Sequence, residues 1–184
     1  MAKVLYSVTM SLDGFIAGPG GDMGWMTAYL GPNPEMTSLV DRIGSLLVGR
    51  RTYDGDDPNK GGEGEGEAFG GGWDGPQYVL THRVPAGAPA NEFFMDDFAS
   101  ALASAKAAAG DKYVNVLGAD VARQCLEAGE LDEVLTLVAP VLLGDGTRLF
   151  DHPGGRQVGL ERLSVTSAPM ATNLWFRVLP GLSG

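Results

Sequence analysis

The sequence predicts a single α/β domain with a mainly parallel central sheet and antiparallel strands at its C-terminal end. Residues 113–139 have the strand, turn, helix and strand pattern that is typical of a parallel pair. The alternating stretches 157–166 and 173–179 indicate two antiparallel strands. The chain has 184 residues, of which 44% are hydrophobic, which is enough for one sizeable core. We therefore expect residues 1–184 to form one domain.

The first half of the chain begins with a strand that is rich in β-branched and aromatic residues and stops at the turn around Asp13 and Gly14. A short apolar stub and a glycine-rich loop follow, and then Pro34 marks the first turn of a helix. The predicted elements are a strand at 3–10, the stub at 15–17, the loop at 18–24, a helix at 34–45 and a buried strand at 46–48.

The second half opens with an acidic, glycine-rich loop at 54–76, which has almost no apolar periodicity. A loop of this length inside a compact domain is usually functional or disordered. We predict strands at 77–81, 91–94, 113–117 and 133–139, a helix that Asp96 caps and that ends near Gly110, and a helix at 120–128.

The charge and cysteine content exclude several classes of partner. A net charge of -10 argues against nucleic acid or an anionic membrane, because both need a positive field on the protein. The single cysteine, Cys125, excludes an internal disulfide and a multi-cysteine zinc site, and we expect no bound metal. With no leader and no apolar run of membrane length, we expect a cytoplasmic protein.

Polar and basic residues follow two of the predicted strands. Thr81, His82 and Arg83 end the strand that begins at residue 77, and they offer a hydroxyl, a titratable ring and a guanidinium. The segment 49–52 follows a buried strand and carries two arginines. Because open α/β sheets bind ligands at the carboxyl ends of their strands, these residues together favour a phosphate over solvated surface side chains.

A third strand end lies at residues 117–121. Gly118 permits a close backbone approach, and the helix that follows offers free N–H groups and a positive dipole to a pyrophosphate. Asp120 leaves an alternative open, because as a helix cap it would use the same N–H groups.

Two weaker patterns have better explanations than a site. Gly70, Gly72 and Gly75 match G-x-G-x-x-G, but they lead through Pro76 into a strand and not into a helix, so we interpret the match as chance. The acids of the 54–76 loop do not have the spacing of an EF-hand, which favours a solvated acidic loop.

Five ordered segments strongly resemble the dihydrofolate reductase-like superfamily, and in particular the reductase domain of bacterial riboflavin biosynthesis and its stand-alone relatives. These segments are VTMSLDGFIAG (8–18), LLVGRRTYD (46–54), YVLTHR (78–83), VNVLGADVARQCLEAGELDEV (114–134) and APVLLGDGTRLF (139–150). The resemblance covers most of the chain and implies a three-layer sandwich with NADPH across the carboxyl ends of the sheet.

The resemblance also implies roles for the residues in these segments. The segment 18–24, which ends at Trp25, is similar to the loop that covers the nicotinamide in these reductases. The cofactor-binding positions that it implies are Thr9, Ile16, Ala17, Gly49, Arg50, Arg51, Thr52, Leu80, Thr81, His82, Arg83, Leu117, Gly118, Ala119, Asp120 and Val121, with Thr81 to Arg83 on the 2'-phosphate. Trp25, Pro140 and Phe150 are the expected walls of the substrate pocket.

The chain departs from the family pattern in ways that bear on the substrate. Residues 26–34 hold no acid to bind a pteridine, which disfavours folate reduction. Ala119 replaces the second glycine of the common Gly-Gly pair, which adds a methyl group where the backbone meets the phosphate. The riboflavin enzyme is usually fused to a zinc deaminase, and this chain has one cysteine and no deaminase segment, so the riboflavin role is disfavoured as well.

We therefore expect an NADPH-dependent oxidoreductase that transfers hydride to a C=N or C=O bond of a small molecule and that forms a homodimer. Asp13 is the candidate residue near the reacting centre, as a substrate anchor or proton relay, and its alternative is a simple turn residue. Two rival hypotheses remain open, which are a flavin- or deazaflavin-dependent reductase on the same fold and an NADPH-binding dimer without turnover.

Overall fold

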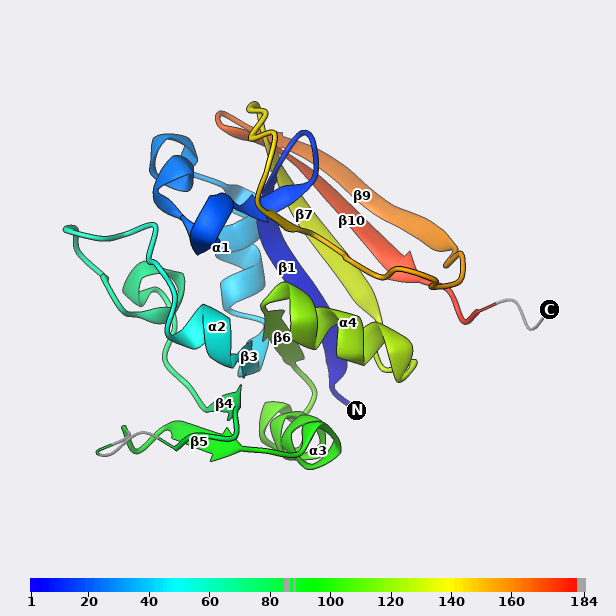
Figure 1. Ribbon diagram of the computed structural model, residues 1–184. Helices are drawn as coiled ribbons and strands as arrows, with labels where there is room; N and C mark the ends of the chain where they lie inside the picture. Colours follow the sequence, from blue (N-terminus) through cyan, green and yellow to red (C-terminus); the bar gives the residue numbers. More distant parts are fainter. Residues whose placement is uncertain (85–86, 88, 182–184) are drawn as a thin grey trace.

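The computed structural model describes residues 1–84, 87 and 89–181 and shows three layers (Figure 1). A mixed eight-stranded sheet lies in the middle, helix α1 covers one of its faces, and helices α3 and α4 cover the other. This arrangement confirms the predicted three-layer α/β sandwich of the dihydrofolate reductase-like type.

The sheet has the strand order β5-β4-β3-β6-β1-β7-β10-β9. The first six strands in this order are parallel, β10 is antiparallel to β7, and β9 is antiparallel to β10. Its strands are β1 (Lys3–Ser11), β3 (Ile43–Gly49), β4 (Gln77–Leu80), β5 (Glu92–Met95), β6 (Tyr113–Leu117), β7 (Glu133–Ala139), β9 (Leu160–Ala168) and β10 (Ala171–Val178).

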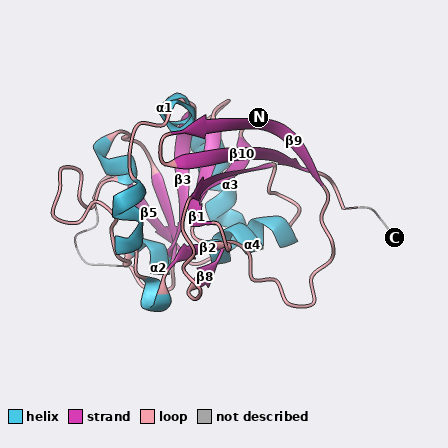
Figure 2. Ribbon diagram, turned by 90° about the horizontal axis from the view of Figure 1, so that it is seen from above, coloured by secondary structure: helices cyan, strands magenta, loops and turns pink. Residues whose placement is uncertain are grey.

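A second, two-stranded sheet pairs β2 with β8 beside the end of β1 (Figure 2). The α-helices are α1 (Pro34–Val40), α2 (Arg50–Tyr53), α3 (Phe98–Ala109) and α4 (Ala119–Glu127), the two short strands are β2 (Phe15–Ala17) and β8 (Thr147–Arg148), and the 3-10 turns are η1 (Pro19–Gly21), η2 (Gly24–Tyr29) and η3 (Ala68–Gly71). No helix of the described residues is long and apolar enough to span a bilayer.

The two faces of the sheet bury separate apolar clusters. On the face of α3 and α4, Val4 and Tyr6 of β1 pack with the alanines of α3 and with Val121. On the opposite face, Leu39 of α1 packs with Leu5 and with residues of β3, β4 and β7. Because both faces are covered, the inner strands are rich in buried apolar residues, as parallel strands usually are, and a few buried polar residues lie among them.

The first helix is shorter than predicted, and the prediction of a helix over 34–45 was wrong at its end. Helix α1 stops at Val40, and β3 already begins at Ile43. The strand needs these residues because it packs against the end of α3: a Cβ on Gly44 would lie 2.6 Å from the carbonyl oxygen of Ala109. The apolar residue at 43 therefore belongs to the sheet.

The cap of α3 also differs from the prediction by one residue. The carboxylate of Asp97, and not of Asp96, accepts a hydrogen bond of 2.7 Å from the N–H of Ser100. Sequence alone did not distinguish two adjacent aspartates as caps. The G-x-G-x-x-G match does lie in a loop that leads into β4, as expected.

A buried carboxylate joins four strands of the sheet. Glu133 of β7 is only 2% exposed and accepts hydrogen bonds from Lys3 (2.8 Å), Tyr113 (2.9 Å) and Trp175 (2.8 Å), on β1, β6 and β10. The guanidinium of Arg42 lies over the rings of Tyr113 and Trp175, at 5.0 and 5.1 Å. This network fixes the central strands relative to one another.

Replacing Glu133 with Met should therefore lower the free energy of unfolding by about 2–4 kcal/mol, because it leaves two buried donors without an acceptor. Glu161→Gln is the matched control, since its pair with Arg177 is exposed and such pairs contribute about 0–1 kcal/mol. Urea denaturation followed by circular dichroism measures both. Equal stability of the two variants would contradict the structural role of Glu133.

Candidate active site

The carboxyl ends of the parallel strands form one row, which we call the carboxyl edge. At its centre β6 lies next to β1, and the chain leaves these two strands over opposite faces of the sheet. From β1 it passes through α1 to β3, and from β6 it passes through α4 to β7. Such a switch in direction opens a crevice at the strand ends, where ligands bind in open α/β sheets.

The ends of β3 and β6 approach each other as closely as glycine allows. Gly118 has a φ of +111°, and a Cβ at this position would lie 2.5 Å from the hydroxyl oxygen of Thr52. A Cβ on Gly49 would lie 3.1 Å from the side chain of Val121. The side chains of Thr52 and Val121 therefore lie directly against the backbone of these two turns, where only glycine leaves room for them.

Helix α4 begins directly at this point, and its first turn is not capped by a side chain. Gly118 is the N-cap residue and makes no side-chain cap hydrogen bond. Asp120, considered as a cap in the sequence, instead accepts hydrogen bonds from Arg123 (2.7 Å) and Gln124 (2.9 Å). The capping interpretation of Asp120 was therefore wrong.

The hydrogen bond from Arg123 is the main reason why the pKa of the Asp120 carboxyl is lowered. The carboxylate is thus ionised and turned toward its own helix. The N–H groups of the first turn remain available to an anion, in a position where the helix dipole favours negative charge.

The two arginines after β3 have different environments. Arg50 pairs with Asp54, lies over the ring of Tyr53, and donates a hydrogen bond of 3.1 Å to the carbonyl oxygen of Arg83. Arg51 is exposed and lies close enough to Asp120 to lower its pKa further. Arg50 therefore connects the ends of β3 and β4, whereas Arg51 faces solvent.

The end of β4 is a tight polar turn. Thr81 is only 7% exposed, and its hydroxyl oxygen accepts a hydrogen bond of 3.0 Å from the N–H of Arg83. The side chains of His82 and Arg83 are exposed beyond it. The structure thus brings Leu80 to Arg83 beside Gly49 to Thr52, as the sequence predicted for two neighbouring strand ends.

Asp13 clamps the end of β1 to the loop after β7. Its carboxylate accepts hydrogen bonds from the hydroxyl of Ser11 (2.6 Å) and from the N–H groups of Leu143 (3.1 Å) and Gly144 (2.7 Å). These bonds, with that of Ser11 first, lower the pKa of Asp13 to about 2. The turn at Asp13 is therefore held by a partner 130 residues away in the chain.

The short strand β2 lies next to this clamp. Ile16 and Ala17 are buried, and Gly146 approaches so closely that a Cβ there would lie 2.0 Å from the carbonyl oxygen of Ala17. Thr9 and Pro140 stand near the ends of the paired strands β1 and β7. These residues line the part of the carboxyl edge next to β1.

Two of the predicted pocket residues occupy quite different positions. Trp25, in η2, is half-buried, and its Nε1 has no hydrogen-bond partner among the described residues. Phe150 packs edge-on against Tyr6, with ring centroids 5.5 Å apart, and belongs to the apolar cluster under α3 and α4. Phe150 thus contributes to the core.

The sequence did not single out a polar pair inside the sheet. The hydroxyl of Ser7 donates a hydrogen bond of 2.8 Å to Oδ1 of Asn115, and both residues are buried. Nδ2 of Asn115 has no partner among the described residues. The available signal was a polar residue at an inward position of each strand.

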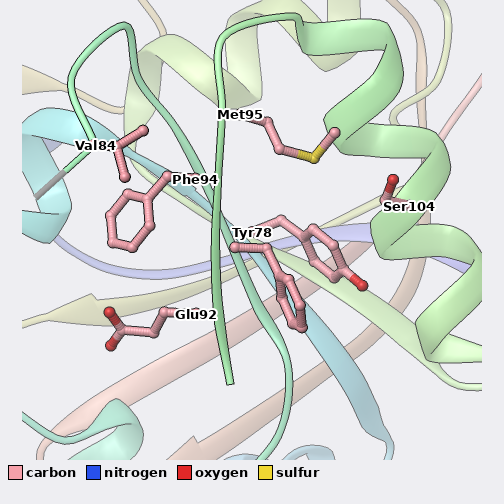
Figure 3. A pocket seen from close by; sticks show the side chains of 7 residues that line it. Tyr78, Val84, Glu92, Phe94, Met95 and Ser104 are labelled. Atoms are coloured by element: carbon pink, nitrogen blue, oxygen red, sulfur yellow. The ribbon is translucent and has the colours of Figure 1, made fainter. Parts of the chain in front are cut away.

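A hollow of about 590 Å³ lies along the outer strand β5 (Figure 3). The stacked rings of Tyr78 and Phe93 line it, together with Glu92, Phe94, Met95, Ser104 and Val84. It includes none of the predicted site residues. Among the described residues there is also no group of three His, Cys, Asp or Glu side chains that could hold a metal.

The clamp predicts a pH dependence of stability. Because the pKa of Asp13 falls from 3.8 to about 2, its contribution is fully present above pH 4 and is lost as the pH falls through 2. We expect Asp13→Asn to lower the urea midpoint at pH 7, and we expect the gap to wild type to narrow between pH 4 and pH 2. A gap that does not change with pH would contradict this assignment.

Residues 2–172 match the family described as the RibD C-terminal domain. The uncharacterized protein YyaP of Bacillus subtilis is 24% identical over 156 residues, which are 80% of each chain. A putative riboflavin biosynthesis protein from Shewanella sp. PV-4 has a similar structure, with a TM-score of 0.74, 22% identity and coverage of 98% of this chain and 100% of the other.

Dihydrofolate reductase from Enterococcus faecalis, solved with NADP(H), shares the fold with a TM-score of 0.60 at 15% identity, over 96% of both chains. These likenesses show the dihydrofolate reductase-like fold. Since the family match spans nearly the whole chain, the protein belongs to the RibD C-terminal domain family.

Proposed function

We propose that the protein is an NADPH-dependent oxidoreductase that transfers hydride to a C=N or C=O bond of a small molecule. The observation that carries this proposal is that the ends of β3, β4 and β6 lie side by side at one edge, which has basic residues and has glycine at two of its turns. Family membership and the NADP(H) complex of the Enterococcus enzyme support it.

The residues at this edge fit a dinucleotide phosphate. A Cβ on Gly118 would clash with the hydroxyl of Thr52, so glycine lets this hydroxyl lie against the start of α4, whose first turn no side chain caps. We assign the pyrophosphate to the backbone of Leu117 to Val121, with Thr52 and Arg51 beside it.

We assign the 2'-phosphate to Thr81, His82 and Arg83. Arg50 is already held by Asp54 and by the carbonyl oxygen of Arg83, so it positions the turn, whereas Arg83 can direct its guanidinium at the phosphate. The fork of Arg83 and the exposed ring of His82 provide the donors that distinguish NADPH from NADH.

Bound NADPH would supply the hydride from C4 of its nicotinamide. Thr9, Ile16 and Ala17 would flank that ring, and segment 18–29 with Trp25 would exclude water from it. A buried donor without a partner, as on Trp25, is expected to meet an acceptor in an occupied site.

With a pKa of about 2, Asp13 carries no proton at neutral pH. We therefore assign it to anchoring the clamp at the end of β1 and not to donating a proton. The substrate pocket would lie next to it, between Trp25 and Pro140.

The central test of this function is a fluorescence titration with NADPH, NADH and a reduced deazaflavin, followed by a screen for consumption of the one that binds. We expect NADPH to bind at tens of micromolar or below. Arg83→Ala should weaken the binding of NADPH by about 1–3 kcal/mol, because a hydrogen bond to a charged group is lost, and it should affect the binding of NADH much less.

Arg156→Ala is the control for that substitution, because Arg156 is an exposed arginine in the 151–159 loop, outside the carboxyl edge. If Arg83→Ala weakens the binding of NADPH and of NADH equally, Arg83 does not bind the 2'-phosphate. Failure of NADPH to bind would overturn the proposed function. Tighter binding of the deazaflavin would show that the cofactor is a deazaflavin and not NADPH.

We further propose a homodimer that forms through β9. This nine-residue strand is at the edge of the large sheet and exposes Leu160 (50%), Leu163 (38%) and Val165 (51%). An edge strand with exposed apolar side chains is a template for pairing with another chain, and a second copy offers the same strand.

Light scattering should therefore give twice the chain mass of 19.2 kDa. Val165→Lys should shift the population toward monomers, because it places a charge in the contact, whereas Glu63→Lys, in the exposed 54–76 loop and outside β9, should leave it unchanged. A wild-type mass of 19.2 kDa would refute the dimer.

A further inference from the structure

The acidic, glycine-rich loop contacts the segment that the proposed function places over the nicotinamide. The N–H of Met23 donates a hydrogen bond of 3.1 Å to the carboxylate of Asp56, and the hydroxyl of Thr27 donates one of 2.9 Å to the carbonyl oxygen of Pro58. Figure 1 shows the loop and the segment on the same side of the molecule. The two contacting residues of the segment, Met23 and Thr27, lie two positions before and two positions after Trp25 in the sequence.

The loop is fixed to the body of the protein at its far end. Nε1 of Trp73 donates a hydrogen bond of 3.2 Å to the carbonyl oxygen of Ile43, in β3. Inside the loop, Asp57 accepts hydrogen bonds from the N–H groups of Asn59 (2.8 Å) and Gly66. The glycine-rich sequence is thus held by its own acids and by the sheet.

The near end of the loop continues directly from α2. Tyr53, the last residue of α2, donates a hydrogen bond of 2.6 Å to Glu92 of β5, and Asp54 pairs with Arg50. Only Gly55 separates Asp54 from Asp56. The chain from Arg50 to Asp56 is therefore a short, supported connection between the carboxyl edge and Met23.

We infer that residues 54–58 are a brace that couples α2 to segment 18–29, and that Asp56 is a positioning residue for that segment. The inference rests on the proposed function in one respect only, which is that segment 18–29 covers the nicotinamide. The cofactor phosphates would contact α2, and the nicotinamide would lie under the segment, so the brace would connect the two ends of one ligand.

The chemistry of Asp56 fits this role. The hydrogen bond from Met23 is the main reason why the pKa of Asp56 is lowered, and Lys60 lies 3.7 Å from the same carboxylate. A carboxylate that accepts a backbone N–H makes a stronger bond than a neutral acceptor. Asp56 therefore holds the backbone of the segment, whereas Pro58 holds the side-chain hydroxyl of Thr27.

Hydrogen exchange of residues 18–30, followed by mass spectrometry on the full-length protein, tests the brace without any ligand. Asp56→Ala and Thr27→Val should each speed the exchange of this segment by about 2- to 10-fold, as expected for the loss of one hydrogen bond. Thr27→Ser keeps the hydroxyl and should exchange like wild type. Glu63→Gln, which removes an exposed charge from the same loop, should also exchange like wild type.

The same measurement with NADPH tests the coupling. Saturating NADPH should slow exchange of residues 18–30 in wild type, and Asp56→Ala should lose most of this protection while it still binds NADPH. Undiminished protection in Asp56→Ala would overturn the coupling.

The brace and the proposed function can fail separately. If Asp56→Ala and Thr27→Val both exchange like wild type, the brace is overturned, whether or not NADPH binds. If NADPH binds to none of the proteins but exchange of residues 18–30 is faster in both variants, the brace is supported and the proposed function is overturned.

Discussion

The proposed phosphate-binding residues of the candidate site lie at strand ends or in the turns that leave them, so their geometry depends on the register of the central strands. The carboxylate of Glu133 ties β7 to β6 and β10 through two buried hydrogen bonds and to β1 through a partly exposed one from Lys3. A one-residue slip of any of these strands would turn its inward side chain to the other face and leave a buried donor unpaired. The polar network therefore penalises alternative registers that an all-apolar core would tolerate.

The basic residues of an acidic protein have two distinct uses at the carboxyl edge. Arg50 is bound to Asp54 and to the carbonyl oxygen of Arg83, and Arg123 is bound to Asp120 and Glu127. These pairs set the shape of the turns and offer little free charge. Arg51 and Arg83 are exposed at the same edge. With a net charge of -10, the protein repels anions at long range, so local donors and the start of α4 must provide the attraction.

The strand ends at 49–52, 80–83 and 117–121 were predictable because each couples a local apolar run to a polar or glycine turn. The end of α1 was not predictable, since Ile43 fits a helical spacing with Leu39 and belongs to β3 because that strand packs against the end of α3. The hydrogen-bond partners of Asp13 could not be predicted from the sequence for a related reason. Leu143 and Gly144 offer N–H groups, which every residue has, and only the fold brings them to the carboxylate.

The acids of the 54–76 loop have contacts that composition alone did not reveal. A glycine-rich chain pays a high entropic cost for order, and isolated carboxylates in water offset little of it. In this loop, however, Asp56, Asp57 and Glu65 each accept a hydrogen bond from a backbone N–H. Two of these N–H groups, those of Gly61 and Gly66, belong to glycines of the loop, and the third belongs to Met23. The same composition that predicts a solvated loop thus also permits an ordered one, which can reach across to segment 18–29.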